Sequence, residues 1–78
     1  MVRAYVLIKT EPGRILDIAY LLRELPSVER ADAVTGPADL IALVNAPDAR
    51  SLAEFIFRSV QTIAGVKETD TRIVVIGD

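Results

Sequence analysis

The chain contains no cysteine and no histidine, and these two absences do most to narrow its chemistry. Without cysteine there is neither a disulfide nor a thiol nucleophile. Without histidine the chain lacks the commonest general base and the commonest metal ligand. Cysteine proteases, Ser-His-Asp hydrolases and zinc enzymes are therefore excluded, and we expect no catalytic residue, metal site or cofactor. Catalysis by a carboxylate or a lysine stays open in principle.

The chain also has no excess of positive charge and no long apolar run. The formal net charge is −2 and the isoelectric point about 5.0, whereas a nucleic-acid-binding domain normally carries a basic face. No apolar run approaches the roughly 20 residues that span a bilayer, and Ala4–Ile8 is too short for the core of a signal peptide. We therefore expect a cytoplasmic protein that binds neither nucleic acid directly nor a membrane.

The size of the chain indicates self-association. Its 78 residues are expected to form one domain, 1–78, whose core is marginal without disulfides or a structural metal. Hydrophobic residues nevertheless make up 51% of the sequence, at the upper end of the globular range. Burying apolar surface against other copies of the chain would stabilise such a domain, so a homo-oligomer is expected.

The hydrophobic pattern predicts the order strand, helix, strand, strand, helix, strand. Thr10-Glu11-Pro12 is typical of a helix start, and Pro47-Asp48 of another. Glu54 and Arg58 are expected to pair on the exposed side of the second helix. The expected strands cover residues 2–9, 28–35, 39–46 and 66–76, and the expected helices end before Pro26 and at Gly65.

The two halves of the chain are similar in pattern, which predicts a ferredoxin-like βαββαβ fold of the α+β class. Ala4 aligns with Ala42 and Ile18 with Ile56, in the same element order. Right-handed crossovers then place strands one and three in the centre of a four-stranded antiparallel sheet. Both central strands are apolar on both faces, and two helices can cover only one face. The other face is expected to pack against the same face of a second copy, as in dimeric α/β barrels.

The segment from Thr35 to Val44 combines a turn with a carboxylate at the start of an apolar strand. Gly36 and Pro37 favour a chain reversal, and Asp39 follows directly. Asp39 has two interpretations at this point: it tightens the hairpin, as aspartate often does, or it accepts hydrogen bonds from a ligand ammonium.

Thr69 and Thr71 form a second candidate group. Because they lie two residues apart on the last expected strand, their hydroxyls share one face, which Ile73 continues as apolar surface. Threonine favours strands in any case, so β-propensity alone explains them. The alternative is a small polar patch on apolar surface, which suits a ligand with one charged and one apolar end.

These segments together resemble the effector-binding domain, also called the RAM domain, of the Lrp/AsnC (feast/famine) transcription regulators. The resemblance covers most of the chain, and its most specific part is the hairpin motif Thr-Gly-x-x-Asp-Leu. It rests on residues 4–14 (AYVLIKTEPGR), 28–36 (VERADAVTG) with Asp39-Leu40 after them, and 66–75 (VKETDTRIVV).

The resemblance implies a sensor of free amino acids or related small molecules, with the ligand held between dimers that assemble into a larger ring. Carried over by position, Thr35 and Gly36 lie at the binding loop, Asp39 faces the ligand ammonium, and Thr69 and Thr71 lie near its polar groups. The family usually adds a helix-turn-helix domain, so the resemblance is to the stand-alone form, which acts on transcription indirectly, with full-length regulators as candidate partners. The family often has an aromatic residue where this chain has Ala38.

Two other classes of protein fit the same fold plan. A small dimeric α/β-barrel enzyme, such as a cofactor-free monooxygenase, would need polar catalytic groups in a cavity between sheet and helices. An amino-acid-binding domain of the ACT type would bind its ligand nearer the first strand–helix loop, around Thr10–Gly13. The position of a ligand separates these classes from the sensor.

Overall fold

The computed structural model describes residues 1–77 and has the predicted order of elements. The residues at which several helices and strands begin or end differ from those expected. The strands are β1 (Val2–Thr10), β2 (Val28–Ala33), β3 (Leu40–Ala46) and β4 (Val66–Ile73), and the helices are α1 (Ile15–Arg23) and α2 (Ala49–Phe55), the latter continued by a π-helical turn, η1 (Ile56–Val60).

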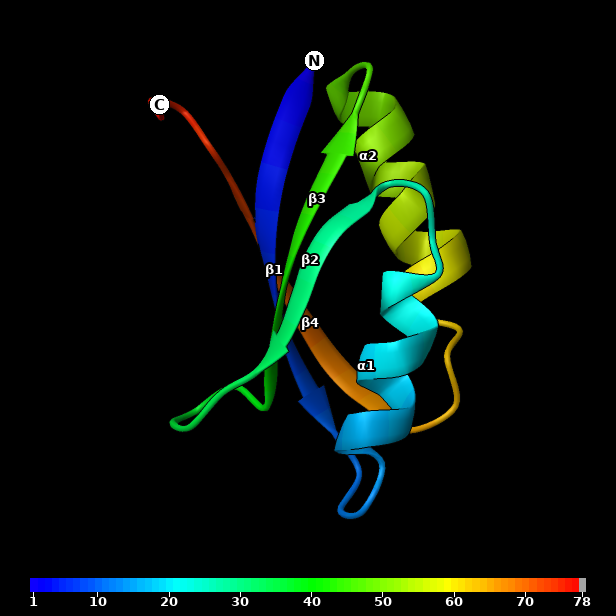
Figure 1. The fold of residues 1–78 in the computed structure, drawn as a ribbon. Helices are drawn as coiled ribbons and strands as arrows, with labels where there is room; N and C mark the ends of the chain where they lie inside the picture. The colour runs from blue at the N-terminus through cyan, green and yellow to red at the C-terminus, as the bar shows by residue number, and fades with distance from the viewer. Residues whose placement is uncertain (78) are drawn as a thin grey trace.

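The sheet has the ferredoxin-like strand order predicted from the repeat. Its order is β2-β3-β1-β4, and every neighbouring pair is antiparallel. Figure 1 shows both helices on one side of the sheet, with the β2–β3 hairpin projecting away from them at the lower left. One face of the sheet is therefore open in the single chain, as the apolar pattern of the central strands predicts.

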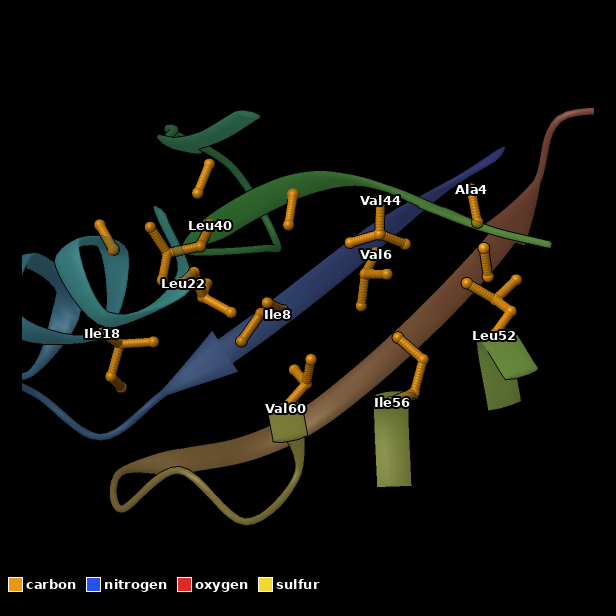
Figure 2. Packing of buried hydrophobic residues seen from close by; sticks show 14 residues of the cluster. Ala4, Val6, Ile8, Ile18, Leu22, Leu40, Val44, Leu52, Ile56 and Val60 are labelled. Atoms are coloured by element: carbon orange, nitrogen blue, oxygen red, sulfur yellow. The ribbon is translucent and has the colours of Figure 1, made fainter. Parts of the chain in front are cut away.

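The core lies between the sheet and the two helices. Ala4, Val6 and Ile8 of β1 are fully buried, and Leu40 and Val44 of β3 lie beside them (Figure 2). Strand alternation places their neighbours in sequence on the other face. The helices fill this side with the buried residues Ile18, Ala19, Leu22, Leu52, Ile56 and Val60.

The open face has an apolar centre with a charged surround. Tyr5, Leu7, Ile41 and Leu43 lie on the two central strands, where Tyr5 pairs with Leu43 and Leu7 with Ile41 across the ladder. The charged residues around this centre lie on the edge strands and near both ends of β1, and they form ion pairs within the chain. These ion pairs are Arg3–Glu29, Arg30–Asp32, Lys9–Glu68 and Arg72–Asp70.

The first helix begins later than predicted. Residues 11–14 form a turn, in which the Arg14 amide donates to the Glu11 carbonyl and Gly13 has a φ of +82°. The Glu11 amide donates instead to Gly65, which ties this turn to the loop before β4. The helix starts at Ile15, and Arg14 at its cap position makes no side-chain cap hydrogen bond. Pro12 belongs to the preceding turn rather than to the first helical turn.

The second helix begins as predicted and ends differently. The Asp48 carboxylate accepts the Ser51 amide at 2.7 Å, a helix cap that lowers the pKa of Asp48. The expected pair of Glu54 and Arg58 is wrong, since Glu54 lies 3.6 Å from Arg50. Pairing of residues four apart assumes a regular α-helix. Arg58 lies in the π-helical turn that begins just after Glu54, and this turn changes the spacing between the two side chains.

Candidate functional site

Asp39 connects the hairpin to the end of β1. Its Oδ2 accepts the backbone amide of Thr10 at 2.9 Å and lies 3.4 Å from the Thr10 hydroxyl. The Asp39 amide donates to the Ile8 carbonyl at 2.9 Å, and its carbonyl accepts the Val34 amide at 3.0 Å. Thr10 is only 7% exposed, so this carboxylate satisfies a buried donor. Asp39 therefore has a structural role within its own chain, whatever else it contacts.

The tip of the hairpin is exposed beyond this anchor. Thr35, Gly36 and Pro37 are exposed, and Gly36 has a φ of +113°, in the region that favours glycine. The strands around the tip are shorter than predicted, because β2 ends at Ala33 and β3 begins at Leu40. This projecting loop presents backbone groups to any molecule that packs against it.

Thr69 and Thr71 lie on the side of β4 that faces the helices. Thr69 pairs with Ile8 and Thr71 with Val6, and both of these β1 residues are in the core. The two threonines are not covered by a helix; they line a groove of about 270 Å³ between β4 and α2–η1. Ile73 continues the groove along β4, as the alternation of the sequence predicted.

The opposite side of this groove is apolar. Leu52 and Ile56 are buried at its base, and Ala49, Ala53 and Phe57 lie above them on the exposed side of the helix. Phe57 is 61% exposed, a large apolar side chain for so small a domain to leave in water. Ala49, Ala53 and Phe57 were not among the predicted site residues, although their spacing by four residues in the sequence places them on one side of a helix.

One hydrogen bond lies at one end of the groove. The Gln61 side-chain amide donates to the Thr69 hydroxyl at 2.9 Å. The Gln61 backbone amide donates to the Ile56 carbonyl at 2.8 Å, the five-residue spacing of a π-turn. The π-turn therefore positions Gln61 opposite Thr69, which residue propensities do not predict. Beyond this hydrogen bond lies a second hollow of about 280 Å³, the polar hollow, which Lys67 and Glu68 help to line.

A further hollow, of about 390 Å³, lies on the open face of the sheet, beside the hairpin. Pro37 and Ala38 of the hairpin line it together with Leu7 and with charged residues of β1 and β4. Lys9 pairs with Glu68 at 3.4 Å, and Arg72 pairs with Asp70 at 2.8 Å. Hydrogen bonds from Arg72 lower the pKa of Asp70, so this carboxylate stays ionised at neutral pH.

The single chain does not bring all of the predicted site residues together. Thr69 lines the groove, the polar hollow and the open-face hollow, and in the last of these it shares the lining with Pro37 and Ala38 of the hairpin. Thr71 lines only the groove, and none of these hollows is lined by Thr35, Gly36 or Asp39.

The described part of the chain has neither a cluster of metal ligands nor a membrane-spanning helix. Among residues 1–77, no three histidine, cysteine, aspartate or glutamate side chains gather in a cluster that could hold a metal ion. No helix in this part is both long enough and apolar enough to cross a membrane.

The strand order, the open sheet face and the groove beside β4 place the chain among the small ferredoxin-like domains. Its sequence then specifies the family. Residues 3–75 match the family model described as the Lrp/AsnC ligand binding domain. The chain belongs to this family, as the hairpin motif and the last strand indicated.

Known relatives agree with this assignment. An uncharacterised HTH-type transcriptional regulator of Pyrococcus abyssi, PYRAB01370, is 31% identical over 70 residues, which cover 90% of this chain and 44% of the regulator. The chain thus spans less than half the length of this curated relative.

Two solved structures show how closely the fold is shared. TTHA0845 from Thermus thermophilus is 32% identical, with a TM-score of 0.93, and the match covers 100% of this chain and 98% of that one. The feast or famine regulatory protein Rv3291c from M. tuberculosis, solved in complex with L-methionine, is 27% identical, with a TM-score of 0.85. That match covers 99% of this chain and 52% of the M. tuberculosis chain.

Proposed function

We propose that this chain is a non-enzymatic sensor domain that binds a free amino acid and, through its assembly with other copies, regulates transcription or metabolism. The groove beside β4, with two threonine hydroxyls on one side and apolar side chains on the other, is the observation that carries the proposal. Such a lining suits a small molecule with one polar and one apolar end. The M. tuberculosis relative in complex with L-methionine supports an amino acid as the ligand.

The proposed site is completed by a second copy. Thr69 and Thr71 of one chain would contact the ligand from the groove, and the hairpin of a neighbouring chain, with Thr35, Gly36 and Asp39, would cover it. Because Asp39 uses Oδ2 to hold Thr10, its other oxygen is the one available to a ligand ammonium. A charge-assisted hydrogen bond of this kind is stronger than a neutral one.

The open face of the sheet supports the dimer on which this assembly depends. Its centre is apolar, and its charged surround is already paired within the chain. An apolar centre inside a polar rim is typical of stable interfaces. Packing two such faces against each other would leave the hairpins and the β4 grooves at the outside, where dimers can meet in a larger ring.

The lining of the groove favours a sensor over an enzyme. The polar side chains that line it are those of Gln61, Thr69 and Thr71, which carry an amide and two hydroxyls rather than the titratable groups that usually act in acid–base catalysis. The loop at Thr10–Gly13, where a domain of the ACT type would bind, is partly occupied by the contacts of Thr10 with Asp39 and of Glu11 with Gly65. A binding role therefore fits the side chains better than catalysis does.

Isothermal titration of the chain with each of the twenty amino acids, combined with light scattering, tests the proposal. We expect at least one amino acid to bind and to change the distribution of assembly states, since a regulatory ligand must bind one state better than another. Absence of binding by all twenty would contradict the proposed function.

A further inference from the structure

The groove beside β4 and the polar hollow next to it form one continuous surface with two different chemistries. They share Gln61 and Thr69, whose hydrogen bond lies at the boundary between them. Among residues 1–77, no charged side chain lines the groove, whereas the polar hollow has Lys67 and Glu68. A ligand across this boundary would have one uncharged end and one charged end.

We propose that this surface selects amino acids with uncharged, aliphatic side chains. The side chain would lie in the groove, between Thr71 and Ile73 of β4 and the apolar side of α2–η1, and the α-carboxylate would lie at the Lys67 end. This inference rests on the proposed function for the existence of a ligand, and adds its chemical class and its orientation.

The absence of charge in the groove is the basis for the selectivity. An ammonium or carboxylate at the end of the ligand side chain would lose its water among Leu52, Ile56 and Phe57 without gaining a partner, which is costly. Each CH₂ group that enters the groove is instead favourable, and strengthens binding about fourfold. Lysine, which has an ammonium group beyond its four side-chain CH₂ groups, should therefore be a poor ligand despite a similar length.

The orientation follows from where the charges lie. Glu68 is paired with Lys9 on the open face, while Lys67 forms none of the ion pairs found among residues 1–77. Lys67 is exposed and lines the polar hollow together with Gln61 and Thr69. A ligand carboxylate at this position gains an opposite charge at no cost to an existing pair.

A homologous series of ligands tests the selectivity. Titration calorimetry with L-2-aminobutyrate, L-norvaline and L-norleucine should show affinity rising about fourfold for each added CH₂. L-lysine should bind at least about tenfold more weakly than L-norleucine, because its ammonium group is desolvated without a partner. Equal binding of lysine and norleucine, or no dependence on chain length, would overturn the selectivity while leaving the proposed function in place.

Two matched pairs of variants test the location. Ala53→Leu adds volume at the groove, and Ala64→Leu adds the same volume at an exposed position that does not line it. We expect Ala53→Leu to weaken the binding of L-norleucine at least about tenfold, because the added side chain takes the space of several ligand CH₂ groups. Ala64→Leu should leave this affinity unchanged. Equal effects of the two substitutions would contradict the placement of the side chain.

Lys67→Gln and Arg58→Gln form the second pair, with L-norleucinamide as a ligand that lacks the carboxylate. Arg58 is also exposed and is in none of the ion pairs among residues 1–77, but it lines neither the groove nor the polar hollow. Lys67→Gln should weaken the binding of L-norleucine about fivefold and leave that of L-norleucinamide unaffected, because an exposed charge pair contributes up to about that factor. Arg58→Gln should change neither. If both ligands respond alike to Lys67→Gln, the orientation is wrong. If neither the natural amino acids nor this series binds wild type, the proposed function itself fails.

Discussion

Replacing Tyr5 with glutamate is expected to separate the assembly into single chains. Tyr5 lies at the apolar centre of the open sheet face and is 47% exposed in the single chain, so a glutamate there has access to water when the chain is alone. In a dimer formed through this face, the symmetry would bury two such carboxylates close together. Arg72, which lies opposite position 5 on β4, is already paired with Asp70, so burying these like charges should raise the dissociation constant by on the order of 10³-fold.

Tyr20→Glu is the matched control for this substitution. Tyr20 is on α1, which covers the opposite face of the sheet, and it is 59% exposed. Sedimentation velocity should show the mass of an oligomer for wild type and Tyr20→Glu, and the mass of one chain for Tyr5→Glu. A Tyr5→Glu protein with the mass of the wild-type oligomer would contradict association through the open face.

Substitutions of Asp39 are expected to separate its structural role from its proposed ligand role. Asp39→Ala leaves the buried amide of Thr10 without its acceptor and should lower the free energy of unfolding by about 1–3 kcal/mol. In Asp39→Asn, the side-chain amide oxygen can still accept from Thr10, so most of this stability should remain. The charge that attracts an ammonium is lost in both variants.

Urea unfolding and ligand titration measure the two roles independently. Asp39→Asn should unfold near the wild-type urea midpoint but bind its amino acid at least about tenfold more weakly, as expected for the loss of a charge-assisted hydrogen bond. Wild-type affinity in Asp39→Asn would show that Asp39 only holds the hairpin. An unchanged urea midpoint in Asp39→Ala would contradict the structural role.

Much of the fold could be predicted from the sequence because its pattern is simple. The alternation in β1 and β3 determines which residues face the helices, and both central strands have the predicted neighbours. The helix cap at Asp48 also follows from local chemistry. These features depend on residues that are close in sequence or that repeat with a fixed period.

The features that were predicted wrongly or missed depend on contacts between distant segments. The turn before α1 is tied to Gly65 across the fold, which its Thr-Glu-Pro start does not reveal. The π-turn η1 changes the spacing beyond Glu54 and brings Gln61 to Thr69, on another element.

Of the candidate site residues, the sequence placed Thr69 and Thr71 on one side of β4 correctly. The sequence alone does not show that this side faces the helices. The strand register shows it, because Thr69 pairs with Ile8 and Thr71 with Val6. For Asp39, the structure supports the turn interpretation through Thr10. The contact of Asp39 with a ligand stays a prediction, as do those of Thr35 and Gly36.

The position of the bound amino acid is the most direct test of the proposed sensor. Amide chemical shifts of the ¹⁵N-labelled protein, followed during titration with L-norleucine, would report it residue by residue. We expect the largest changes at Gln61, Thr69 and Thr71, together with Thr35 and Gly36 of the hairpin. Changes confined to Thr10–Gly13, or to no part of the groove and hairpin, would contradict it.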